Sequence, residues 1–301
     1  MTQYRGQRLR AYLQLVRLPA VFTAMADIVL GFVLTHRTLS PWPEFVALLI
    51  TSTCLYLAGM ALNDFFDREI DARERPRRPI PSGRISPRAA LTLGSILLVV
   101  GLASAFAAGI VASAVAAALA ILILAYDGVL KATPVGPVAM GGCRLLNVLL
   151  GASAAADSIW KGPQIGVAVA MGIYVAGITW FARREAVTSS RIQLIGAAVV
   201  IHSGILLLLA LLFVGGPVSS VEILAALVLL LVVAFVDFRL APAVKDPTPT
   251  KVQAGVKQML LAIVLFDATM IYWATGSPWL ALGTALLIVP AATLGRFIFI
   301  T

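Results

Sequence analysis

The residues best suited to chemistry lie in one short polar stretch, 63–71, which carries Asn63, Asp64, Asp67 and Asp71. In a helix that turns about 100° per residue, these four side chains share one face. A face of carboxylates and an amide, without His or Cys, suits a hard cation such as Mg²⁺. The alternative is a solvated, charge-balanced loop, which explains neither the one-sided spacing nor the position between two apolar runs.

An arginine-rich segment follows this stretch directly and contains Arg73, Arg75, Arg77, Arg78 and Arg84. Guanidinium groups match the geometry of phosphate oxygens, which Mg²⁺ commonly bridges. The two segments together therefore indicate a site for a phosphorylated ligand.

The composition is that of an integral membrane protein. Apolar residues make up 60% of the chain, charged residues 12%, and the mean hydropathy is +0.97. The net charge of +9 does not indicate nucleic-acid binding, because the basic residues lie between apolar runs and do not alternate regularly with aromatic residues. We therefore expect one all-α membrane domain over residues 1–301, with the lipid bilayer as a partner and no nucleic acid.

Ten apolar segments are close to the roughly 20 residues that a membrane-spanning helix needs. The first contains Asp27 and lacks a small-residue cleavage site after it, so we interpret it as a retained span and not as a signal peptide. Small residues such as those at 151–156 would allow close helix packing. The predicted spans are 19–36, 43–63, 88–109, 111–130, 136–156, 164–182, 192–214, 219–240, 252–274 and 278–298.

The distribution of Lys and Arg predicts the orientation of these spans. The loops assigned to the outer side keep only Arg37 and Lys161, while nearly all other basic residues fall on the opposite side. Because positive loops stay in the cytosol, we expect an even number of spans, with the motif loops and both termini cytosolic.

The pattern Asn-Asp-x-x-Asp-x-x-x-Asp after a second span, followed by Arg-Pro-Ile-Pro-Ser-Gly-Arg-Ile-Ser at 78–86, closely resembles the UbiA superfamily of intramembrane prenyltransferases. The likeness extends to the order of the spans, although typical members have nine helices. It implies a polytopic UbiA-like bundle of nine to ten transmembrane helices. It also implies Mg²⁺-dependent transfer of a prenyl group from an isoprenyl diphosphate to a hydrophobic acceptor, with aromatic acceptors among the options.

The resemblance also implies roles for individual residues. Asn63, Asp67 and Asp71, assisted by Asp64, would hold Mg²⁺ against the diphosphate, which metal and arginine charges would help to leave. The residues expected to take part in catalysis are Asp67, Asp71, Lys131 and Glu185. Candidates for binding the diphosphate are Arg17, Arg75, Arg77, Arg78, Tyr126 and Lys131. The alternative for the four arginines is a role as membrane anchors, and for Lys131 an ordinary topology signal.

Arg144 is a candidate site residue independently of the family resemblance, because it lies inside a predicted span. A buried intramembrane arginine is costly and by default faces a polar cavity or a charged partner. Asn147, three residues on, shares its face. We therefore expect Arg144 and Asn147 to line a ligand site, while Asp27 and Asp267 either contact an acceptor or pair with arginines.

The resemblance also implies a second Asp-rich motif after the sixth span, but 179–186 reads Thr-Trp-Phe-Ala-Arg-Arg-Glu-Ala. Glu185 is its only carboxylate, and Arg183 and Arg184 replace much of the acidic set. This version resembles the EboC-like branch of the superfamily. Either the two arginines neutralise the diphosphate directly, or ionisation is impaired and the protein binds a lipid-like molecule without converting it.

Three function classes remain open from the sequence. The first is a prenyltransferase. The second is a non-catalytic or diverged relative that binds or helps export a lipid-like metabolite. The third, a secondary transporter, fits less well because the polar cluster lies at one membrane face and not at the midplane. The enzyme interpretation requires one cavity lined by Asp67, Asp71, Lys131, Arg144 and Glu185.

Overall fold

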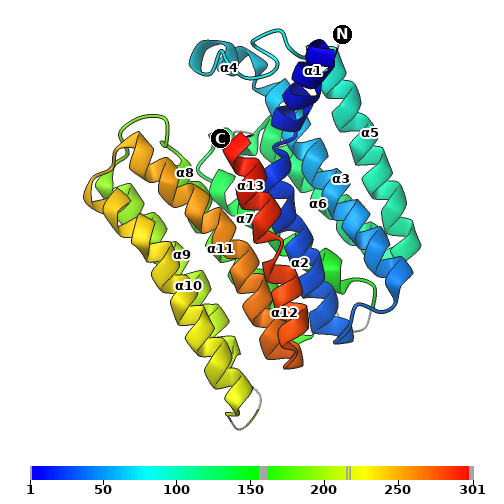
Figure 1. Cartoon of the computed structure of the whole chain (residues 1–301), viewed down its shortest axis with the longest axis vertical. Coiled ribbons are helices and arrows are strands. Elements are labelled where there is room, and N and C mark those ends of the chain that lie inside the picture. Colours follow the sequence, from blue (N-terminus) through cyan, green and yellow to red (C-terminus); the bar gives the residue numbers. More distant parts are fainter. Residues whose placement is uncertain (1, 156–160, 215, 217, 298–301) are drawn as a thin grey trace.

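The computed structural model of the chain describes residues 2–155, 161–214, 216 and 218–297, which form helices and no strand (Figure 1). The α-helices are α1 (Thr2–Leu15), α2 (Leu18–His36), α3 (Trp42–Phe66), α4 (Arg68–Glu74), α5 (Pro87–Ala105), α6 (Ile110–Gly128), α7 (Gly136–Ala152), α8 (Gly162–Ala182), α9 (Arg191–Leu211), α10 (Ser220–Lys245), α11 (Pro249–Thr275), α12 (Pro278–Ala285) and α13 (Ile288–Phe297). Two short 3₁₀ turns are η1 (Phe106–Ala108) and η2 (Leu130–Ala132).

The predicted all-α membrane bundle is confirmed. Among the described residues, nine helical segments are long and apolar enough to cross a bilayer. The remaining predicted span, the fifth at 136–156, corresponds to α7, an apolar helix of only 17 residues. The last predicted span extends to residue 298, which lies outside the described residues.

The last span is two helices, α12 and α13, where a single helix was predicted. Pro290 lies in the first turn of α13. In a continuous helix its ring would clash with the carbonyl of Leu286, where α12 ends, and it has no N–H to donate. The proline therefore accounts for the break.

Helix α2 runs through the middle of the bundle and packs against α3, α7, α11 and α13 (Figure 1). Its contact with α7 is a backbone contact: a Cβ on Gly31 would lie 2.1 Å from the carbonyl oxygen of Val148, and one on Gly151 would lie 2.6 Å from that of Ile28. Close approach through small residues is a common way for helices to associate in lipid.

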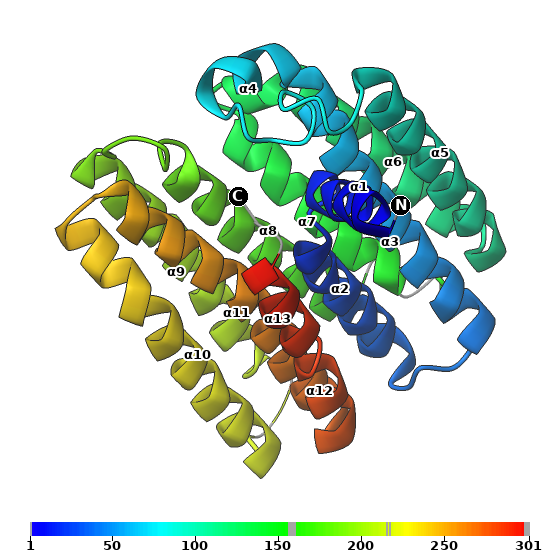
Figure 2. The ribbon, with the colours of Figure 1, turned by 45° about the horizontal axis from the view of Figure 1, so that its top comes forward.

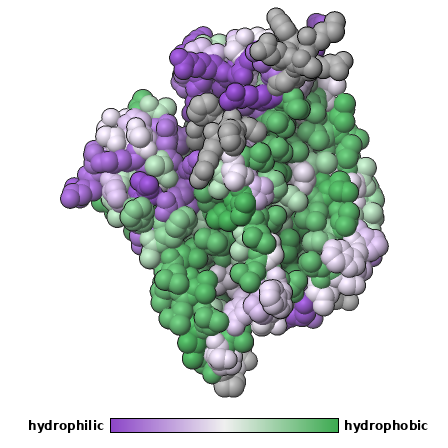
Figure 3. Space-filling model, in the orientation of Figure 1, coloured by the Kyte–Doolittle hydropathy of each residue, from purple (hydrophilic) through white to green (hydrophobic). Residues whose placement is uncertain are grey.

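The polar residues gather at one end of the molecule, where α1 and α4 lie together (Figures 2 and 3). The flanks visible in Figure 3 are largely hydrophobic. Helix α1 precedes the first span and was not predicted. It joins α2 through Arg17, which has a left-handed backbone with φ of 46°. The cytosolic placement of this end stays a prediction.

Candidate active site

Two cavities meet near the polar end of the bundle. The first, which we call the bundle cavity, has a volume of about 590 Å³, within the range of about 300–1,000 Å³ that small-molecule sites occupy. Its polar lining includes Arg17, Asn63, Asp67, Asp71, Arg75, Arg78, Tyr126, Asp127, Lys131, Arg144, Asn147, Arg183 and Glu185. Its apolar lining includes Leu55, Leu119, Ile123, Val175, Ile178, Leu260 and Ile263.

The second cavity, which we call the loop cavity, has a volume of about 1400 Å³ and lies between α1, the 75–86 loop and the α8–α9 connection. It shares Arg17, Glu74, Arg75, Arg78 and Glu185 with the bundle cavity. These shared side chains form a charged boundary between the two spaces.

The five residues that the enzyme interpretation requires around one cavity all line the bundle cavity: they are Asp67, Asp71, Lys131, Arg144 and Glu185. They come from α4, η2, α7, the connection after α8 and the junction between α3 and α4. Segments far apart in the sequence are therefore brought to one site.

The motif is not one continuous helix. Helix α3 ends at Phe66 and α4 begins at Arg68, with Asp67 between them at φ −83° and ψ 0°. The backbone hydrogen bonds nevertheless continue, since Asp67 N–H donates to Asn63 O (2.9 Å) and Asp71 N–H donates to Asp67 O (2.8 Å). Asn63, Asp67 and Asp71 therefore follow one another at intervals of one turn.

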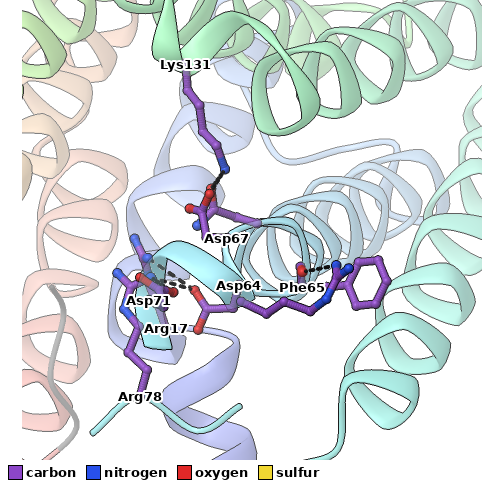
Figure 4. A network of polar contacts seen from close by, with 9 residues as sticks. Arg17, Asp64, Phe65, Asp67, Asp71, Arg78 and Lys131 are labelled. Carbon is purple, nitrogen blue, oxygen red and sulfur yellow. Dashed lines mark hydrogen bonds and ion pairs between the residues drawn. The ribbon is translucent and has the colours of Figure 1, made fainter. Parts of the chain in front are cut away.

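The four polar side chains of the motif divide into two sets by their partners, and Figure 4 labels the three carboxylates among them. Lys131 Nζ lies 2.6 Å from Asp67 Oδ1 and donates to Asn63 Oδ1 at 3.0 Å. Arg78 lies 2.6 Å from Asp71 Oδ2 and 3.2 Å from Asp64 Oδ1. The expectation that all four side chains share one face is corrected for Asp64, which does not line the bundle cavity with the other three.

Asp64 is also separated from the other three by its surroundings. It lies 3.5 Å from Arg17 and lines the loop cavity, whereas Asn63, Asp67 and Asp71 line the bundle cavity. Asp64 thus pairs with two of the arginines between the cavities, and the structure does not bring it to the cavity that Asp67 lines.

The donor set suits Mg²⁺ by its chemistry, because Asn63, Asp67 and Asp71 offer only oxygen atoms. Across the residues that the structure describes, no three His, Cys, Asp or Glu side chains come close enough to hold a metal ion. Lys131 and Arg78 occupy the carboxylates instead. Glu185 lines the same cavity, and its buried Oε2, which has no hydrogen-bond partner, could accept a cation.

The segment after α8 places its three charged residues differently. Glu185 lines both cavities, and burial raises its pKa, an effect partly offset by the nearby guanidinium of Arg75. Arg183 lines the bundle cavity and donates to the carbonyl oxygen of Ala132 at 3.4 Å. Arg184 is exposed and lines neither cavity, so the structure does not bring it to the site.

The predicted diphosphate clamp is also divided. Arg75 and Arg78 line both cavities, whereas Arg77 lines only the loop cavity. Arg17 reaches both from the junction of α1 and α2. Arg77 is therefore placed away from Asp67 and Lys131.

Arg144 is buried on α7, where its Nε lies 2.8 Å from Asp27 Oδ2 and its Nη2 donates to Thr23 O at 2.9 Å. Asn147 donates to the same Asp27 oxygen at 2.8 Å and accepts from Ser52 Oγ at 2.7 Å. Asp27 is fully buried and does not line the cavity. Asp27 was expected either to contact an acceptor or to pair with an arginine, and in the structure it pairs with Arg144.

Sequence reasoning missed Asp127, which lies at the end of α6 beside Tyr126. It is buried, lines the bundle cavity, and its Oδ2 has no hydrogen-bond partner. One signal could have found it: Asp127 precedes Lys131 by four residues, so in a helix the two would face the same way.

Comparison with known proteins identifies the family. The UbiA prenyltransferase family matches residues 24–264. The chain belongs to this family. A digeranylgeranylglyceryl phosphate synthase from Methanopyrus kandleri is 34% identical over 157 residues, which cover 50% of this chain and 57% of the relative. The enzyme of that name from Methanothrix thermoacetophila is 45% identical over 104 residues, covering 33% and 38%. This UbiA family member thus spans about half the length, or less, of these relatives.

Solved structures share the fold. One, described as concerning digeranylgeranylglyceryl phosphate synthase in membranes, has a TM-score of 0.66 and 20% identity, covering 90% of this chain and 99% of the other. A UbiA homologue from Archaeoglobus fulgidus bound to GPP and Mg²⁺ has a TM-score of 0.59 and 17% identity, covering 86% and 99%. At these identities the likeness concerns the fold alone.

Proposed function

We propose that the protein is an intramembrane prenyltransferase, which moves a prenyl group from an allylic diphosphate to a hydrophobic acceptor with the help of Mg²⁺. The observation that supports this proposal is the bundle cavity itself. Carboxylate and amide oxygens, Lys131 and several arginines meet there with apolar walls, and this combination fits a ligand with a charged head and a hydrocarbon tail.

Asn63, Asp67 and Asp71 would hold the metal, whose charge would stabilise the leaving diphosphate as the allylic C–O bond breaks. Lys131 and Arg78 neutralise these carboxylates in the absence of ligand, at 2.6 Å from Asp67 and Asp71. In the complex the same two cations would turn to the phosphate oxygens, joined by Arg17 and Arg75. The pairs therefore keep the cations positioned beside the place where negative charge develops.

The apolar walls would hold the prenyl chain and keep water from the cation formed on ionisation. Leu119, Val175 and Leu260 belong to these walls. Asp127 lines the cavity and its buried Oδ2 has no hydrogen-bond partner. This carboxylate would accept the proton that the acceptor loses when its new bond forms. The relatives named above support an isoprenyl diphosphate as donor, since one is bound to GPP and Mg²⁺.

A second candidate function rests on the segment after α8. Glu185 is the only carboxylate at 179–186, so the charge available for a second metal there is small. On this alternative the protein binds an isoprenoid or another lipid-like metabolite in the bundle cavity and does not cleave it.

The test is to incubate the purified protein with labelled farnesyl or geranylgeranyl diphosphate, with and without Mg²⁺, and a panel of hydrophobic acceptors. We expect Mg²⁺-dependent release of diphosphate, and its abolition in Asp67→Ala and in Asp71→Ala. Glu69→Ala is the matched control, because Glu69 belongs to the same motif but its side chain is 80% exposed. Binding of the labelled diphosphate without release, with every acceptor, would favour the second candidate. Unchanged release in both Asp variants would contradict the metal assignment.

A further inference from the structure

The loop cavity is strongly positive. Seven arginines line it, against the three carboxylates of Asp64, Glu74 and Glu185. It lies at the polar end of the molecule, where α1 faces the loop that follows α4 (Figure 2). Concave positive surfaces concentrate anions, so a cavity with this excess of charge favours a negatively charged ligand.

Ion pairs within the protein neutralise part of this positive charge. Arg17 and Arg78 form ion pairs with the motif carboxylates Asp64 and Asp71. Arg8 and Arg77 make no ion pair among the described residues, and both are exposed to the cavity. These two side chains therefore carry charge that the motif does not neutralise.

The wall that carries Arg77 is held in place by hydrogen bonds. Arg84 donates from Nη2 to the carbonyl oxygen of Arg77 (2.6 Å), from Nε to Ser82 Oγ (2.9 Å) and from Nη1 to Gln14 Oε1 (2.6 Å). The last of these bonds ties the loop to α1, which carries Arg8. Both unpaired arginines are thus presented from two elements that are fastened to each other.

The charge at Arg8 and Arg77 is not explained by the diphosphate of the donor. Asn63, Asp67 and Lys131, which would surround that diphosphate, line the bundle cavity and not the loop cavity. Arg8, Arg77 and Arg84 line the loop cavity and not the bundle cavity. A second anion would therefore sit on the far side of the boundary formed by Arg17, Arg75 and Arg78.

We propose that the loop cavity is a second anion site, which binds a phosphate group distinct from the donor diphosphate. Guanidinium groups match phosphate oxygens in geometry and retain their charge at any physiological pH. The group could belong to the headgroup of an anionic lipid at the membrane surface or to a soluble phosphate. The site does not depend on prenyl transfer.

The test uses the full chain in detergent and isothermal titration calorimetry with three probes: dihexanoyl phosphatidic acid, dihexanoyl phosphatidylcholine and inorganic phosphate. We expect the phosphatidic acid to bind more tightly than the phosphatidylcholine, and Arg8→Gln or Arg77→Gln to weaken it about tenfold. The matched controls are Arg73→Gln and Arg88→Gln, which remove the same charge from exposed positions that line neither cavity. We expect these controls to bind like the wild type.

The source of the phosphate follows from the same titrations. Inorganic phosphate that binds as tightly as phosphatidic acid, with the same loss in Arg8→Gln and Arg77→Gln, assigns the site to a soluble phosphate. Weak binding of inorganic phosphate assigns it to a lipid headgroup. Equal weakening in the Arg73 and Arg88 controls, or no weakening in the Arg8 and Arg77 variants, would overturn the proposal.

One further variant separates this proposal from the proposed function. Asp67→Ala should lose diphosphate release and keep phosphatidic acid binding, because Asp67 does not line the loop cavity. If the wild-type protein fails to transfer prenyl groups but binds phosphatidic acid through Arg8 and Arg77, the proposed function is contradicted and the second anion site is supported.

Discussion

The Glu185 carboxyl has one buried oxygen, Oε2, without a hydrogen-bond partner, and burial raises the pKa of this carboxyl. The folded protein binds the proton of this carboxyl more tightly than the unfolded chain does, so ionising it lowers stability. The contribution of Glu185 to stability is greatest at acidic pH and is lost as the pH rises through its raised pKa. We predict that Glu185→Gln, without ligands, melts at a higher temperature than the wild type at neutral pH, and that the difference shrinks as the pH falls toward about 4.

The measurement is a series of thermal melts in one detergent across this pH range. Glu69→Gln is the control, because its side chain is exposed and its melting temperature should follow the wild type. A Glu185→Gln variant that is less stable than the wild type at neutral pH would mean that a partner satisfies this carboxylate. In the turnover assay we expect Glu185→Ala to be milder than Asp67→Ala, since Glu185 is the only carboxylate in its segment.

Replacing Asp127 should affect prenyl transfer and not diphosphate release, because the proposed partner of Asp127 is the acceptor. We expect Asp127→Asn to slow prenyl transfer by about 10²-fold while diphosphate release continues, since general-base catalysis typically contributes that much. Water would then capture more of the prenyl cation, so the ratio of prenyl alcohol to transferred product should rise.

Chromatography of the labelled products measures that ratio. Asp237→Asn is the control, because Asp237 lies on α10, pairs with His202 and does not line the bundle cavity. Parallel loss of release and transfer in Asp127→Asn would place this carboxylate with the diphosphate-binding groups instead.

At the scale of the element, sequence periodicity predicted the spans but not where a helix breaks. The predicted 43–63 became α3, Trp42–Phe66, because a long apolar run determines a membrane helix almost alone. The break at Asp67 could not be predicted in this way, since it accompanies an ion pair with Lys131, which is remote in sequence. Helix α1 was missed because it is polar and has no apolar period to detect.

The close contact between α2 and α7 predicts that a larger residue at Gly31 destabilises the bundle. A Cβ on Gly31 would lie 2.1 Å from the carbonyl oxygen of Val148, and backbone cannot move aside as a side chain can. We predict that Gly31→Ala lowers the free energy of unfolding by about 1–3 kcal/mol, the usual cost of overpacking. Because α7 carries Arg144 and Asn147, turnover should fall as well.

Unfolding in increasing sodium dodecyl sulfate, followed by circular dichroism, measures this difference. Gly283→Ala is the matched control: it also lies in a helix, but a Cβ there would have no atom within 4 Å. This variant should be as stable as the wild type or gain about 0.5–1 kcal/mol from the lower entropy of its unfolded chain. Equal stability of Gly31→Ala and the wild type would show that α2 and α7 can separate without cost.

At the scale of the whole molecule, the two cavities lie on opposite sides of a group of shared arginines. The bundle cavity opens among membrane helices, the loop cavity lies among the connections at one end, and Arg17, Arg75 and Arg78 stand between them. A donor bound through its diphosphate would reach this boundary from the bundle side. Any anion in the loop cavity would reach it from the opposite side, so the two would influence each other through shared arginines.

This arrangement has a sidedness, and the distribution of basic residues predicts it. The membrane-spanning segments run alternately up and down, with α4 in the connection between α3 and α5, and with α12 and α13 together as one span. The connection after α4 and the one between α2 and α3 therefore lie at opposite ends (Figure 1). If the basic end is cytosolic, a cysteine at Arg88 faces the cytosol and one at Thr38 faces the other side; both positions are exposed. We predict that a membrane-impermeant maleimide labels Arg88→Cys only in inverted vesicles and Thr38→Cys only in intact cells. Both variants are made after replacing Cys54 and Cys143 by serine. Labelling with the opposite preference would place the charged cavities on the outer side and contradict the predicted orientation.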